Sequence, residues 1–111
     1  MKREIKKNGK LVDEIVSYLL KKGHHQLKID LNYTTEYTEF TIYLNNLTDN
    51  ERELLNECFS QLRDDIMEEY GWELLGESSQ SAELNLIGML IDDYRMETEG
   101  DVTIIYILRN H

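Results

Sequence analysis

The sequence predicts an α+β fold, in which a four-stranded, mainly antiparallel sheet and helices packed on one of its faces form a two-layer sandwich. Three observations support this prediction. Apolar residues recur every three or four positions in three segments, and they alternate with polar residues in two pairs of shorter segments. The 111 residues contain no proline and only six glycines, which is not the composition of a linker or a disordered tail. We therefore expect one domain over residues 1–111, with the order α-β-β-α-α-β-β.

The first expected helix covers residues 10–22 and follows a basic leader of about ten residues. Leu11, Ile15 and Leu19 recur every fourth position, which places one apolar stripe along a helix. Gly23 comes directly after the last lysines and fits the left-handed position just past a helix end. We therefore expect the helix to stop at this glycine.

An antiparallel hairpin is expected next, between residues 27 and 44. Apolar and polar residues alternate there on both sides of the short segment Thr34-Thr35-Glu36. The apolar face of this hairpin should lie on the helices. The other face carries Tyr37 and Tyr43 among polar residues.

A second helix is expected over residues 49–70. Thr48 and Glu51 have the spacing of a capping box, which predicts the start of a helix. Gly71 is expected to close it. Its apolar stripe consists of Leu55, Phe59, Leu62 and Ile66, widened by Cys58 and Tyr70.

Residues 81–91 are expected to form a short third helix with Ser81 as its N-cap. The same run could be a buried strand, although Asn85 and Gly88 fit a strand poorly. A second hairpin follows, because an alternating segment, a turn at Gly100-Asp101 and a β-branched segment succeed one another up to Leu108.

The last expected strand is apolar on both of its faces. Its core face is expected to consist of Val102, Ile104, Tyr106 and Leu108, and we expect Leu31, Phe40, Leu62 and Ile104 to share one interior. Ile105 and Ile107 would then lie on the opposite face of the sheet. The resulting candidate homodimer interface is an exposed apolar patch of Tyr37, Tyr43, Ile105 and Ile107. Alternatively, this strand is central and the chain's own helices cover both of its faces.

The chain is strongly acidic, with 22 Asp and Glu against 12 Lys and Arg and a net charge of −10. Residues 29–111 hold 19 acidic and four basic residues, a net charge of −15. Such a body repels phosphate backbones, so direct binding of nucleic acid is disfavoured. A candidate acidic partner surface consists of Asp64, Asp65, Glu68, Glu69, Asp92 and Asp93. In size and acidity the chain is similar in kind to phage anti-CRISPR proteins and toxin-immunity proteins, which present carboxylates to basic sites.

No catalytic or metal-binding motif stands out. The segment Gly76-Glu77-Ser78-Ser79-Gln80 lacks the second glycine of a nucleophile elbow, and a polar loop before the third helix is the interpretation that fits. Trp72 is expected to pack at the edge of the core. His24 and His25 are adjacent at the start of a strand, where they would point to opposite faces and could not easily share a metal. Cys58 is a lone cysteine and is expected to be buried and inert. We predict no cofactor and no metal.

The expected location is the cytoplasm, because no secretory signal is visible, no apolar run approaches the length of a membrane span, and there is a single cysteine. The first functional hypothesis is a small binding protein without catalytic activity that forms a homodimer through the exposed face of its sheet. The alternative is an acidic inhibitor that blocks a basic, nucleic-acid-binding cleft of an enzyme. A third hypothesis is a small enzyme that uses a cluster of carboxylates.

Overall fold

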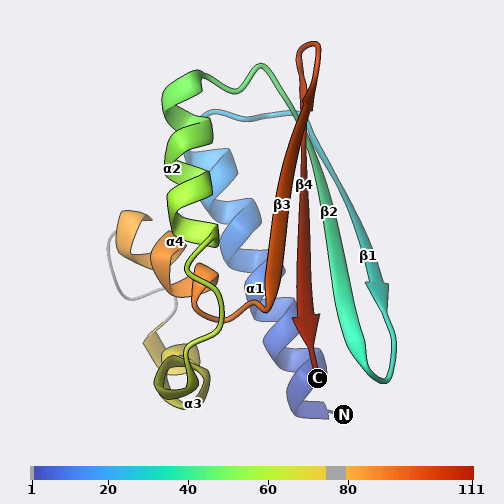
Figure 1. The fold of residues 1–111 in the computed structure, drawn as a ribbon, viewed down its shortest axis with the longest axis vertical. Coiled ribbons are helices and arrows are strands. Elements are labelled where there is room, and N and C mark those ends of the chain that lie inside the picture. Colours follow the sequence, from blue (N-terminus) through green and yellow to red (C-terminus); the bar gives the residue numbers. More distant parts are fainter. Residues whose placement is uncertain (1, 75–79) are drawn as a thin grey trace.

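Four strands form one antiparallel sheet in the order β1-β2-β4-β3 (Figure 1). The strands are β1 (Leu27–Tyr33), β2 (Tyr37–Asn45), β3 (Asp93–Glu99) and β4 (Val102–Asn110). The computed structural model describes residues 2–74 and 80–111, and the side chains within 3–72 and 84–111. In this sheet β4 is a central strand that pairs with β2 on one side and with β3 on the other.

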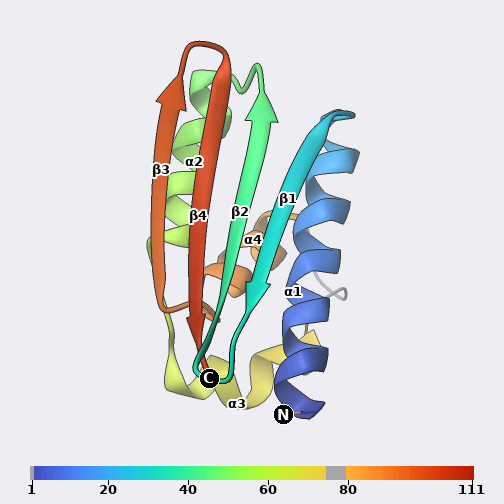
Figure 2. The ribbon, with the colours of Figure 1, turned by 90° about the vertical axis from the view of Figure 1, so that its right-hand side faces the viewer.

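The helices lie on one side of the sheet (Figure 1). They are α1 (Lys2–Lys21), α2 (Asp49–Phe59), α3 (Asp65–Leu74) and α4 (Gln80–Gly88). Figure 2 looks onto the opposite face of the sheet, and no described helix stands in front of it. We call the helix-covered side the inner face and the other side the outer face. The predicted α+β sandwich is therefore confirmed, and the described residues form four helices where three were expected.

The core fills the space between the helices and the inner face. Cross-strand pairing aligns inner-face residues in rows across the sheet, because paired residues of antiparallel strands point to the same side. One such row is Ile29, Ile42, Ile105 and Met96, and the next is Leu31, Phe40, Ile107 and Tyr94. The helices contribute buried Leu11, Ile15, Leu55, Phe59 and Ile87 to the same cluster.

The face of β4 is the main point at which the sequence-based prediction was wrong. Ile105 and Ile107 are only 1% and 2% exposed and belong to the core on the inner face. Val102, Ile104, Tyr106 and Leu108 therefore lie on the outer face. The four residues expected to share one interior are also separated: Phe40 is buried and Leu62 packs against the core, whereas Leu31 is 49% exposed and Ile104 faces outward.

Helix α1 starts at Lys2, so the basic leader is part of the helix and does not precede it. One of its leader residues, Asn8, is buried. The predicted stop is confirmed: Gly23 has a φ of +94°, and the backbone N–H of His24 donates to the carbonyl of Leu19 at 3.0 Å. The helix therefore ends in the way that its terminal glycine predicts.

The single helix expected over residues 49–70 is in fact two helices. The predicted capping box at the start of α2 is confirmed, with the backbone N–H of Glu51 donating to the Thr48 hydroxyl at 3.2 Å and the Glu51 carboxylate accepting from the backbone N–H of Thr48 at 3.2 Å. Helix α2 ends at Phe59, and Leu62, which lies in the connection to α3, has a φ of +61°. A left-handed leucine cannot continue a right-handed helix, so the apolar stripe expected beyond Phe59 is interrupted.

Helix α3 starts afresh at Asp65, and the carboxylate of the preceding Asp64 accepts from the backbone N–H groups of Ile66 and Met67 at 3.0 and 3.1 Å. Because α3 is a separate helix, its residues do not continue the apolar periodicity of α2. Ile66 is therefore 65% exposed although it was expected to be buried, and Tyr70 is exposed as well. Gly71, the expected end of the second helix, lies within α3.

Helix α4 confirms the helical interpretation of the run after residue 80, although it starts one residue before Ser81 and ends at Gly88. A Cβ atom on Gly88 would lie 1.8 Å from the carbonyl oxygen of Cys58, so α4 and α2 meet there backbone against backbone. The polar-loop interpretation of Gly76 to Ser79 lies outside the described residues.

Candidate functional site

The outer face of the sheet has an apolar stripe on its central strand. The stripe consists of Val102, Ile104, Tyr106 and Leu108, and we call it the β4 stripe. All four side chains are partly exposed. Outward residues of an antiparallel sheet with one solvated face are usually polar. Four successive apolar residues on the outward side of a central strand are therefore unusual. The stripe is therefore a candidate contact surface.

Two rows across the outer face combine this stripe with charges of both signs. The Lys28 row runs Lys28, Tyr43, Ile104 and Glu97, and the Asp30 row runs Asp30, Thr41, Tyr106 and Arg95. Each row therefore has apolar or uncharged residues in its centre and opposite charges at its two ends. From one row to the next, the sign of the charge at each end is reversed.

These charges already interact along their own strands. Lys28 Nζ lies 3.9 Å from Asp30 Oδ2 on β1, and Arg95 Nε lies 3.5 Å from Glu97 Oε1 on β3. All four side chains are largely exposed, so each of these pairs contributes little to stability on its own. These four side chains can therefore interact with a partner at little cost in free energy.

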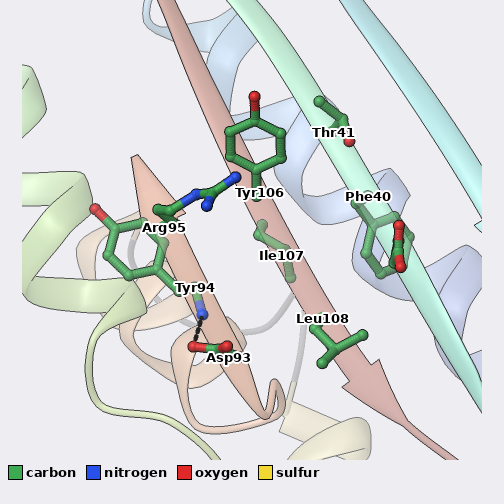
Figure 3. Close-up of a pocket in the computed structure, with 9 residues that line it drawn as sticks. Phe40, Thr41, Asp93, Tyr94, Arg95, Tyr106, Ile107 and Leu108 are labelled. Carbon is green, nitrogen blue, oxygen red and sulfur yellow. Dashed lines mark hydrogen bonds between the residues drawn. The ribbon is translucent and has the colours of Figure 1, made fainter. Parts of the chain in front are cut away.

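A shallow groove of about 280 Å³ lies beside Tyr106 on the outer face (Figure 3). The Arg95 guanidinium carbon lies 4.4 Å from the centre of the Tyr106 ring, and Figure 3 shows the two side chains together above β4. Thr41, Leu108, Glu39 and Asp93 also line the groove. A groove lined by both apolar and charged residues suits the side chains of a protein partner.

The predicted interface residues are divided between the two faces. Tyr37 and Tyr43 lie on the outer face, and Tyr43 pairs directly with Ile104. Ile105 and Ile107 lie in the core and cannot contact a partner. The residues that take their place on the outer face are Ile104 and Tyr106.

The predicted acidic surface is also divided. Asp64 caps α3, Glu68 pairs with Arg109, and Asp92 accepts from Arg63 at 2.8 Å and from the backbone N–H of Asn110 at 2.6 Å. Asp64 is exposed despite its role as a cap, as are Asp65, Glu69 and Asp93. The acidic-inhibitor hypothesis stays a prediction from composition, with three of its six carboxylates committed within the chain.

A second polar group, the Arg109 cluster, lies at the end of the sandwich near both termini. Arg109 is 0% exposed. Its Nε and Nη2 donate to the Glu4 carboxylate at 3.2 and 3.1 Å, and its Nη1 donates to Glu68 Oε2 at 3.1 Å and to the Leu90 carbonyl at 2.7 Å. Nη2 also donates to Glu68 Oε1. All five N–H donors of the guanidinium therefore have acceptors, and the cluster joins α1, α3 and β4.

The edge of the Arg109 cluster is closed by Trp72, which is partly buried against the core as expected. Its ring centre lies 4.8 Å from the Arg109 guanidinium carbon, and its Nε1 donates to Glu68 Oε2 at 3.2 Å. Sequence reasoning missed the cluster, because no motif marks residues 4, 68 and 109 as neighbours. With every donor satisfied, its role is structural.

The Arg109 cluster makes stability depend on pH. Burial by itself would raise the pKa of Glu68, but hydrogen bonds and charge from Arg109, with the charges of Arg63 and Lys7, hold this pKa below its ordinary value of 4.5. The folded state therefore binds this proton less readily than the unfolded chain. The contribution to stability is complete above pH 4.5 and is lost as the pH falls through the lowered pKa.

We expect Glu68→Gln to flatten the decline of the urea midpoint as the pH falls below 4.5. The decline should be reduced rather than abolished, because the pKa of Glu51 is also lowered. Burial would raise this pKa, but the hydrogen bonds with His24 and Thr48 and the charge of His24 together outweigh burial. Urea titrations followed by circular dichroism at several pH values measure this. A decline as steep as that of the wild type would exclude Glu68 as a source of the pH dependence.

Other predicted sites are dispersed. His24 pairs with Glu51, whereas His25 is exposed. Cys58 is buried, and this burial, with the nearby charge of Glu57, raises the pKa of its thiol. Within residues 2–74 and 80–111, no group of three or more His, Cys, Asp or Glu could hold a metal ion. In the same part of the chain, no helix has the length and apolar character needed to cross a membrane.

No protein-family model, curated protein or solved structure matches this chain. Its function therefore has to be inferred from its own residues.

Proposed function

We propose that this chain is a binding protein that forms a homodimer through the outer face of its sheet. The observation that carries the proposal is the β4 stripe, which is apolar and only partly shielded on a strand whose other face lies in the core. Burial of such a surface removes apolar area from water at about 25 cal/mol per Å². Uncharged Tyr37, Thr41 and Tyr43 extend the stripe onto β2.

The size of the outer face sets the expected affinity. Four strands that lie about 4.8 Å apart and rise about 3.3 Å per residue give a flat area on the order of 500 Å² per copy. This is near the lower end of the range for specific interfaces, so we expect dissociation in the micromolar range. A weak dimer of this kind would respond to changes in protein concentration.

The double substitution Ile104→Thr and Tyr106→Thr should convert the dimer to a monomer. Threonine is β-branched and therefore suits a strand, while the apolar contact area is lost. Sedimentation velocity of the wild type and the variant between about 1 and 100 µM measures the effect, since this range spans micromolar dissociation.

Leu20→Gln is the control, because Leu20 is an exposed apolar residue on α1, away from the outer face. It should leave the dimer intact. A wild type that sediments as a monomer throughout the range would refute the proposal. A dimer that survives in the double variant would place the contact elsewhere, for instance along the edge strands.

A further inference from the structure

We propose that the two copies pack outer face to outer face about a two-fold axis that runs across the strands, between the Lys28 row and the Asp30 row. This inference rests on the proposed function and adds the geometry of the partner. Closed two-fold symmetry is the commonest arrangement of homo-oligomers, and it requires a surface that is complementary to itself. The two rows meet that requirement in their apolar centre and in their charged ends.

The apolar centre is self-complementary about this axis. The rotation exchanges the two rows, so each β4 stripe lies on the β4 stripe of the other copy. Ile104 then faces the partner's Tyr106, and by symmetry Tyr106 faces the partner's Ile104. Farther from the axis, Val102 faces the partner's Leu108. Every outward apolar residue of the stripe thereby meets another apolar residue, as the packed core of an interface requires.

The charged ends are self-complementary about the same axis. Lys28 faces the partner's Asp30 on one side of the sheet, and Arg95 faces the partner's Glu97 on the other. The ion pairs of 3.9 and 3.5 Å within each chain thus become groups of four charges of alternating sign. Only Glu99 and the partner's Asp93 meet as like charges, and they lie at the solvated rim, where salt screens them.

A two-fold axis parallel to the strands is the main competing arrangement. This axis also places unlike charges opposite each other, because Lys28 would face the partner's Glu97 and Asp30 would face the partner's Arg95. However, it lays the β4 stripe on β2 of the other copy and sets Leu108 against the partner's Glu39. Burying a carboxylate against an apolar side chain is unfavourable. The apolar match therefore favours the axis across the strands.

Two charge-swap variants distinguish these arrangements. Both replace Lys28 with Glu, and both leave the net charge unchanged: one is Lys28→Glu/Asp30→Lys, and the other is Lys28→Glu/Glu97→Lys. With the axis across the strands, the first variant restores every unlike contact between the copies. The second places like charges opposite each other at both ends of both rows. We expect the first variant to keep the dissociation constant within about threefold of the wild type and the second to raise it at least about tenfold.

Sedimentation equilibrium of the three proteins gives these constants, and thermal unfolding confirms that each variant is folded. The reverse ranking would establish the axis parallel to the strands and overturn the inference. Equal dissociation constants for the two variants would also overturn it, while the proposed dimer would stand if Ile104→Thr/Tyr106→Thr still abolished association. A monomeric wild type would refute the proposed function itself, whatever the variants do.

Discussion

Replacement of Arg109 with methionine is expected to lower the free energy of unfolding by about 3 to 5 kcal/mol. Methionine fills a similar volume but has no donors, so the carboxylates of Glu4 and Glu68 and the Leu90 carbonyl lose their shared partner. The two partly buried carboxylates would then lack the compensating positive charge of Arg109. For a small domain this loss is a large fraction of the total stability. Urea unfolding at neutral pH, followed by circular dichroism, measures it.

Arg3→Met is the matched control, because Arg3 is exposed on the same helix that provides Glu4. It should change the free energy of unfolding by no more than about 0.5 kcal/mol. A second variant tests the reason for the loss: Arg109→Met combined with Glu68→Leu should recover part of the stability, since it removes one of the unpaired charges. If Arg109→Met behaves like the control, the cluster does not hold α1, α3 and β4 together.

Replacement of Gly88 with alanine is expected to destabilise the fold by about 3 kcal/mol or more. The new Cβ atom would lie 1.8 Å from the carbonyl oxygen and 2.8 Å from the carbonyl carbon of Cys58. These are backbone atoms, so no change of rotamer can relieve the clash, and α4 must move away from α2. The same displacement opens the core where Phe59 and Ile87 are buried. Thermal unfolding should show a marked fall in the midpoint temperature.

Gly9→Ala is expected to have the opposite effect and to raise the free energy of unfolding. Gly9 also lies within a helix, but a Cβ atom there would have no neighbour within 4 Å. Alanine should therefore stabilise α1 by roughly 0.5 to 1 kcal/mol, because it restricts the unfolded chain. A Gly88→Ala protein as stable as the wild type would mean that α2 and α4 do not approach as closely as described.

Local patterns predicted those elements whose ends are fixed by neighbouring residues. The end of α1 at Gly23, the hairpin of β1 and β2, and the capping box at Thr48 and Glu51 follow from short-range chemistry. The break between α2 and α3 does not. Neither glycine nor proline marks residues 60–64, and the left-handed Leu62 is stabilised by tertiary packing, which periodicity cannot detect.

The face of β4 was assigned wrongly because apolar content was the only criterion. Val102, Ile104, Tyr106 and Leu108 are collectively more apolar than the alternate set, which contains Thr103 and ends at Arg109. The length of the turn between β3 and β4 predicts the correct face of β4. A two-residue turn at Gly100-Asp101 pairs Glu99 with Val102, and hence Met96 with Ile105 and Tyr94 with Ile107. That register puts Ile105 and Ile107 on the apolar face of β3, which is the core face.

Of the candidate site, the sequence predicted the surface but only half of its residues. Tyr37 and Tyr43 lie on the outer face because they alternate with buried Thr38, Phe40, Ile42 and Leu44. Ile104 and Tyr106 were missed along with the face of β4. Arg109 could not be found from spacing, because its partners lie 105 and 41 residues away along the chain.

The central position of β4 affects how the protein is made. A polypeptide leaving the ribosome displays β2 and β3 with no strand between them until residues 102–110 have been synthesised. The hairpin of β1 and β2 can form early, but its inner face and the helices lack the isoleucines that complete the core. The sheet should therefore close late in synthesis, when β4 pairs with β2 and β3.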